Sequence, residues 1–246
     1  MARKKIVFVI VEGPSDDTAL GVLFTKIFDK NHVHVEITHG DITSDPALNP
    51  ANIIENTVKF VKQYADNNHY KPVHFQQIIH LIDTDGTYVS DDKVVQDDNV
   101  DGTVYSPLEI RTDNREGIIR RNRNKKLAMN KLFGKSTIWN IPYQAYYMSC
   151  NLDHVLYDKQ NSSDEEKEND SYAFAKKYKN DVPGFLKFIS ESSFSVGEDY
   201  LSSWKYIQQE NHSLERHTNL GLCFISAESD SDKWLSTTSR LKSGCS

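Results

Sequence analysis

The chain has 246 residues, of which 38% are hydrophobic and 26% charged, and its formal net charge is −6. This length suits one large α/β domain or a core domain with an extension. The longest apolar run, 6–11, is far shorter than the roughly 18 residues of a membrane-spanning helix. With three widely spaced cysteines and no signal-peptide pattern, we expect a cytoplasmic protein without disulfides or membrane contact.

The first 83 residues predict alternating strands and helices. Continuous or alternating apolar residues predict strands at 5–11, 32–38 and 73–83. Amphipathic spacing predicts helices at 14–28 and 49–64, the first of them capped by Ser15. A βαβαβ order of this kind implies an α/β fold with a mainly parallel sheet flanked by helices.

Beyond Asp85 the pattern is looser. We expect a long loop or hairpin at 86–113, a basic helix at 114–133, a strand at 144–149 and a short helix from Asn151. Residues 161–170 are acidic and almost free of apolar side chains, which predicts a linker. A mainly helical segment with a strand at 220–225 follows. The predicted organisation is an α/β catalytic domain at 1–157, with an insertion at about 86–135, and an acidic linker with a helical C-terminal extension at 158–246.

Acidic residues follow two of the predicted strands. Glu12 leaves the first strand, and Asp83 and Asp85 leave the third. The carboxyl ends of parallel strands face a common crevice, and two acids spaced two apart on an extended chain point to the same side. Three convergent carboxylates would repel one another without a divalent cation, which predicts Mg²⁺ or Mn²⁺. The alternative is that these acids only cap helices and satisfy turns.

The segment I-V-E-G-P-S-D-D-T-A-L at 10–20 resembles the first motif of the TOPRIM domain, in the E-G-x-S-D form of OLD-family (overcoming lysogenization defect) nucleases. Asp83-Thr84-Asp85 resembles the D-x-D motif of that domain. Over roughly residues 5–155, the resemblance implies a Rossmann-like fold with Glu12 as a metal-linked acid or base. It also implies that Asp83 and Asp85 bind Mg²⁺ and that Asp16 serves a second ion.

Asp153 begins the helix after the strand at 144–149, and some TOPRIM-like defence proteins have an acid in a comparable turn. The resemblance therefore implies a fourth carboxylate, whereas a simple helix-start acid is the alternative.

The chain lacks a Walker A sequence and the cysteine module of primases, and it is too short for a topoisomerase. The resemblance then implies a Mg²⁺-dependent nuclease acting on DNA or RNA, a phage-defence effector controlled by a separately encoded ATPase or sensor protein. A defence sensor or adaptor that binds a partner without catalysis is the non-enzyme alternative.

A second resemblance competes with the first. The sequence D-T-D-G-T at 83–87 also matches the motif of haloacid-dehalogenase-like phosphatases, in which Asp83 would be the nucleophile and Asp85 the acid. That motif usually ends the first core strand, whereas here a complete βαβα unit precedes it. The later acid pair of these phosphatases is matched only loosely by Glu228, Asp230 and Asp232.

The helix predicted at 114–133 concentrates positive charge in an acidic protein. Five cations within seven residues could hold nucleic-acid phosphates near the acids. These are Arg120, Arg121, Arg123, Lys125 and Lys126. The alternative is a solvated basic surface that pairs with the acidic segment at 164–170.

Overall fold

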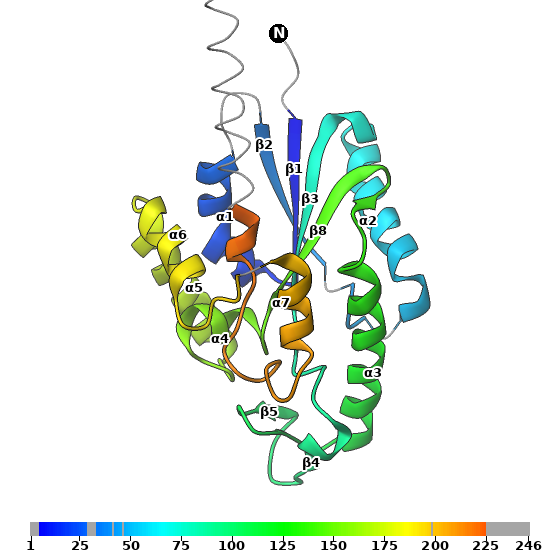
Figure 1. Cartoon of the computed structure of the whole chain (residues 1–246), viewed down its shortest axis with the longest axis vertical. Coiled ribbons are helices and arrows are strands. Elements are labelled where there is room, and N and C mark those ends of the chain that lie inside the picture. Colours follow the sequence, from blue (N-terminus) through cyan, green and yellow to red (C-terminus); the bar gives the residue numbers. More distant parts are fainter. Residues whose placement is uncertain (1–4, 29–32, 41, 46, 198, 225–246) are drawn as a thin grey trace, which may run out of the picture.

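A computed structural model of the chain describes residues 5–28, 33–40, 42–45, 47–197 and 199–224. The main sheet has five strands, which are β1 (Lys5–Val11), β2 (Val33–His39), β3 (Phe75–Asp83), β7 (Thr137–Ile138) and β8 (Ile141–Met148). Their order is β2-β1-β3-β8-β7 (Figure 1). β1 is parallel to both β2 and β3, β3 is parallel to β8, and β7 is antiparallel to β8. The predicted α/β fold with a mainly parallel sheet is confirmed.

Helices cover both faces of this sheet. They are α1 (Pro14–Phe28), α2 (Ile53–Asn67), α3 (Arg115–Leu132), α4 (Leu152–Tyr157), α5 (Asp164–Tyr178), α6 (Val182–Glu191) and α7 (Tyr200–Ile207). In Figure 1, α1, α5 and α6 lie on one side of the sheet, and α2 and α3 on the other. Alternate side chains of β1 enter the two cores, with Val7 and Val9 on the α1 side and Phe8 and Ile10 on the α2 side. The apolar run of β1 is thus explained by burial on both faces.

The segment between β3 and α3 contains a second, smaller sheet. Its strands are β4 (Val94–Gln96), β5 (Thr103–Tyr105) and β6 (Ile110–Thr112), in the order β4-β6-β5. β5 and β6 form the antiparallel pair of the predicted hairpin, and β4 adds a parallel third strand. A small core formed by Val89, Val94, Ile110, Ile119 and Leu214 joins this sheet to α3 and to the C-terminal region.

Two predictions for the C-terminal region are wrong. Asp164–Asp170 is not a linker but the first turns of α5, where Ser163 caps the helix and Glu166 completes the capping box. Residues 221–224 are helical rather than extended, and Ile225 lies outside the described residues. Phe224 packs against Phe24 and Phe28, so the segment shares the core of α1. Within the residues that the structure describes, no helix has the length and apolar character needed to cross a membrane.

His80, in the middle of β3, should make folding stability pH-dependent. Its side chain is buried, its Nδ1 lies 2.8 Å from the Tyr143 hydroxyl, and burial and the Lys125 charge lower its pKa to about 3. The unfolded chain binds this proton below a pH of about 6.5, so stability falls as pH drops from there toward 3. We expect His80→Gln to remove about 2 to 3 kcal/mol of the stability difference between pH 7 and pH 4.5, measured by urea unfolding.

The matched control for this measurement is His34→Gln, which changes a histidine whose side chain is 52% exposed on β2. The control should retain the pH dependence of the unaltered protein. An equal pH dependence in His80→Gln and the unaltered chain would contradict the prediction.

Candidate functional site

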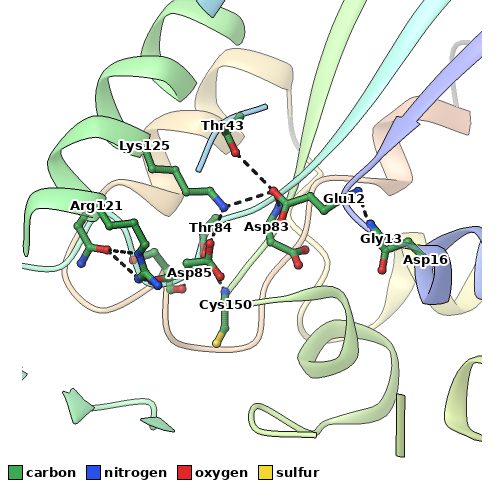
Figure 2. A network of polar contacts seen from close by, with 12 residues as sticks. Glu12, Gly13, Asp16, Thr43, Asp83, Thr84, Asp85, Arg121, Lys125 and Cys150 are labelled. Carbon is green, nitrogen blue, oxygen red and sulfur yellow. Dashed lines mark hydrogen bonds and ion pairs between the residues drawn. The ribbon is translucent and has the colours of Figure 1, made fainter. Parts of the chain in front are cut away.

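The two acidic motifs meet because β1 and β3 are neighbouring parallel strands. Their carboxyl ends lie at one edge of the sheet, as expected for parallel pairing. There the Asp83 backbone N–H donates to Glu12 Oε1 at 3.1 Å, although the two residues are 71 positions apart (Figure 2). Thr43, in the loop after β2, has its Oγ1 3.5 Å from the same oxygen. Glu12 is thus held by groups from two other segments of the chain.

A lysine from α3 reaches into the group of acids formed by Glu12, Asp83 and Asp85, which we call the acidic cluster. The Lys125 side chain is fully buried, and its ammonium group donates to Glu12 Oε1 at 3.3 Å and to Asp85 Oδ2 (Figure 2). The Glu12 and Asp85 side chains are 16% and 21% exposed, so both lie at the border of the protein interior. A buried ammonium group is tolerated only with such charged partners. Lys125 therefore acts as a built-in cation that links the two acidic motifs.

The turn after β3 differs from the expected extended chain. Asp85 has a φ of 48° and Gly86 a φ of 66°, so the chain reverses its direction here. The Asp85 N–H donates to the Cys150 carbonyl at 2.7 Å, and a Cβ at Gly86 would lie 2.5 Å from Leu214. The prediction that Asp83 and Asp85 share one side of an extended segment is therefore wrong. Hydrogen bonds to the β8 side of the sheet stabilise this turn, and glycine at position 86 permits it because a Cβ there would clash with Leu214.

The two aspartates of the D-x-D motif have opposite electrostatic environments. Burial, followed by the charges of Glu12, Asp16 and Asp85, raises the pKa of Asp83 well above its ordinary value. Burial would also raise the pKa of Asp85, but Lys125 and Arg121 hold that pKa below its ordinary value. The charge of Asp85 is thus compensated by two cations, whereas at Asp83 burial and the acidic neighbours outweigh the effect of Lys125.

Asp16, in the first turn of α1, organises the loop that carries Glu12. Its Oδ2 accepts the backbone N–H groups of Gly13 at 2.9 Å and Glu12 at 3.1 Å. Burial is the main reason that the pKa of Asp16 is raised to about 6, and the charge of Asp153 adds to the effect. Asp16 rather than Ser15 thus satisfies the amides of this turn.

Asp153 lies in the first turn of α4, and its charge contributes to the raised pKa of Asp16. Its pKa is raised by burial, and the charge of Lys167 opposes that effect. Asn151 caps α4 by accepting the His154 N–H at 2.8 Å, and Asp153 is an acid of the first turn, as the helix-start alternative requires.

The predicted carboxylates do not converge as three ligands around one point. Among the described residues, no group of three or more histidine, cysteine, aspartate or glutamate side chains is arranged to hold a metal ion. Lys125 instead bridges Glu12 and Asp85. The assignment of Glu12, Asp16, Asp83, Asp85 and Asp153 as metal ligands stays a prediction.

The five cations of α3 have different environments. Arg120, Arg123 and Lys126 are exposed, whereas Arg121 is half-buried and Lys125 fully buried. Arg121 donates to the Tyr105 hydroxyl and to the Asp85 carbonyl, both at 2.8 Å. Placing Lys125 on a phosphate-binding surface is therefore wrong, because its ammonium group lies inside the acidic cluster.

The sequence contains a signal for the role of Lys125, which is its spacing from the apolar residues of α3. Ile119, Asn122, Lys125, Ala128, Met129 and Leu132 are the buried residues of α3. This helical period places Lys125 on the packed face, where a lysine requires acidic partners. Thr43 carries no comparable sequence signal, because its position depends on how the loop after β2 folds.

Comparison with known proteins identifies no relative of this chain. No protein-family model matches it, and neither a curated protein nor a solved structure is significantly similar to it.

Proposed function

We propose that this chain is a TOPRIM-type nuclease that hydrolyses phosphodiester bonds in DNA or RNA with the help of Mg²⁺ or Mn²⁺. The observation that carries the proposal is the contact between Glu12 and the Asp83 backbone at the ends of adjacent parallel strands. It joins the two motifs on which the resemblance to TOPRIM nucleases rests. A role as a phage-defence effector controlled by a separate ATPase or sensor protein is part of the same proposal.

The carboxylates of the candidate site are the chemical type of ligand that binds a hard divalent cation. Carboxylate oxygens are the ligands that Mg²⁺ prefers, and burial, followed by neighbouring negative charges, raises the pKa of Asp83. In this proposal Glu12, Asp83 and Asp85 would hold the first ion and Asp16 and Asp153 a second, although the first three carboxylates do not converge on one point while Lys125 bridges Glu12 and Asp85. When bound, the ion supplies positive charge to the phosphate oxygens and the leaving group.

The chain's own residues have separate tasks in this proposal. Glu12 orients a water molecule or accepts its proton. Lys125 holds Glu12 and Asp85 in place through its two contacts, and its charge lowers the pKa of Asp85 against the effect of burial. Arg121 supports the same turn by donating to the Asp85 carbonyl.

The phosphatase alternative is less well supported. It requires Asp83 as an ionised nucleophile and Asp85 as a proton donor. Asp85 does not suit the role of proton donor, because its Oδ2 accepts from the Lys125 ammonium group and the pKa of Asp85 is lowered by Lys125 and Arg121 against the effect of burial. Glu12, which contacts both Lys125 and Asp83, has no role in the phosphatase motif. The acids at 228, 230 and 232 lie outside the described residues.

The experiment that tests the proposal is incubation of the protein with plasmid DNA, single-stranded DNA and tRNA. Each substrate is tested with Mg²⁺, with Mn²⁺ and with a chelator, and a phosphomonoester is included as a fourth substrate. Cleavage of a nucleic acid that requires the metal supports the proposal. Turnover of the phosphomonoester alone would support the phosphatase instead.

The exposed cations of α3 should contact phosphates. We expect Arg120→Gln/Arg123→Gln/Lys126→Gln to weaken nucleic-acid binding and to reduce the slope of log K against log salt by roughly 0.7 to 0.9 for each phosphate that the variant no longer neutralises. The charge-matched control is Lys176→Gln/Lys177→Gln/Lys179→Gln, which changes three exposed lysines on and just after α5. An equal slope in both triple variants, measured by fluorescence anisotropy, would assign the α3 cations to another role.

A further inference from the structure

A cavity of about 340 Å³ lies between the loop after β2 and the first half of α3. Aliphatic side chains line part of its wall, and amide, guanidinium, hydroxyl and carboxylate groups line much of the rest. The aliphatic residues are Ile42, Leu48, Ile53 and Ile118. The volume is within the range of roughly 300 to 1,000 Å³ typical of small-molecule sites.

This cavity adjoins the acidic cluster through two shared residues. Thr43 lines the cavity, and its Oγ1 lies 3.5 Å from Glu12 Oε1. Arg121 also lines it and donates to the Asp85 carbonyl at 2.8 Å. A group bound in the cavity would therefore lie next to a phosphate positioned at Glu12 and Asp83.

The lining combines three kinds of chemistry that together match a nucleotide. Aliphatic side chains can cover the face of a base, as apolar side chains do for extruded bases in other enzymes. The amides of Asn114 and Asn124 can bond the base edge, and the guanidinium of Arg120 can bind a phosphate. Asp45 lines the loop side of the cavity and accepts the Ala47 N–H, so its charge disfavours a phosphate there. The phosphate would thus lie at Arg120 on α3, and the face of the base would lie on the aliphatic side chains of the loop with its edge toward the two amides of α3.

We propose that this cavity receives one unpaired nucleotide of the substrate, next to the phosphodiester that the acidic cluster cleaves. This inference rests on the proposed nuclease function and adds its substrate class. A paired base cannot enter such a cavity without leaving its stack. The substrate is therefore single-stranded nucleic acid or an unpaired segment, and a perfect duplex is a poor substrate.

The test fills the cavity from α3 with Asn124→Trp and compares it with Leu127→Trp. Asn124 is exposed and lines the cavity, whereas Leu127 is 54% exposed on the same helix and does not line it. Calorimetry without metal measures binding of the four nucleoside 5′-monophosphates. The unaltered protein and Leu127→Trp should bind at least one of them, and Asn124→Trp should bind it at least tenfold more weakly. Arg120→Gln should weaken binding of the monophosphate at least fivefold and leave binding of the corresponding nucleoside unchanged.

Cleavage assays give the second measurement. A single-stranded oligonucleotide should be cleaved at least tenfold faster than its duplex and than an abasic strand of equal length, and Asn124→Trp should remove that preference. Cleavage that is equal on all three substrates, with no monophosphate binding, would overturn the cavity's role and leave the nuclease proposal standing. Monophosphate binding that Asn124→Trp abolishes, in a protein that cleaves no nucleic acid, would support the cavity and contradict the nuclease.

Discussion

Glu12→Gln is expected to reduce Mg²⁺-dependent cleavage by roughly 10²- to 10⁴-fold, the usual contribution of a positioned acid or base. The change keeps the size of the side chain and its ability to accept the Asp83 N–H, but it removes the negative charge. Asp83→Asn should reduce cleavage by a similar factor, because both carboxylates belong to the same proposed site. Single-turnover cleavage rates measure the effect without interference from product release.

The control for these two variants is Glu55→Gln, which removes an exposed carboxylate from the first turn of α2. It should cleave at the rate of the unaltered protein. Near-normal cleavage by Glu12→Gln would contradict the nuclease mechanism. If Asp83→Asn were then inactive on a phosphomonoester that the unaltered chain hydrolyses, the phosphatase alternative would be the better account.

Lys125→Met is expected to lower the free energy of unfolding by about 3 kcal/mol, the lower end for loss of one partner from a buried ion pair. Methionine retains much of the apolar volume but leaves Glu12 and Asp85 facing each other without the ammonium group. We expect the lower end of the range for this loss of unfolding free energy because both carboxylates keep some exposure to solvent. Urea unfolding at pH 7 measures it.

Two comparison variants separate charge from packing at Lys125. Lys126→Met changes the exposed neighbour on the same helix and should alter stability by less than about 0.5 kcal/mol. Lys125→Met/Asp85→Asn should recover part of the stability, because one of the repelling carboxylates is removed. Equal losses in the single and double variants would show that packing, and not charge, explains the effect.

Mg²⁺ provides a further comparison with the same proteins. If the ion binds to the carboxylates that Lys125 bridges, it should raise the melting temperature of Lys125→Met more than that of Lys126→Met. This readout does not depend on cleavage, so it tests the metal assignment separately from the nuclease proposal.

Local sequence patterns determined most of the secondary structure of this protein. The apolar runs at 5–11 and before Asp83 are properties of a few adjacent residues, and they correctly predicted β1 and β3. The position of Glu12 and Asp83 at strand ends followed from the same patterns. The acidic composition of 164–170 wrongly indicated a linker, because the capping pattern from Ser163 to Glu166 begins α5 there.

Contacts between distant segments decided the arrangement of the candidate site. The neighbouring positions of β1 and β3 bring Glu12 to the Asp83 backbone, and packing of α3 on the sheet buries Lys125 between Glu12 and Asp85. The left-handed conformation of Asp85 depends on a carbonyl of residue 150. A sequence pattern records which face of an element is apolar, but not which element covers that face. The presence of acids at the sheet edge was therefore readable from the chain, whereas their pairing with a buried lysine required the tertiary structure.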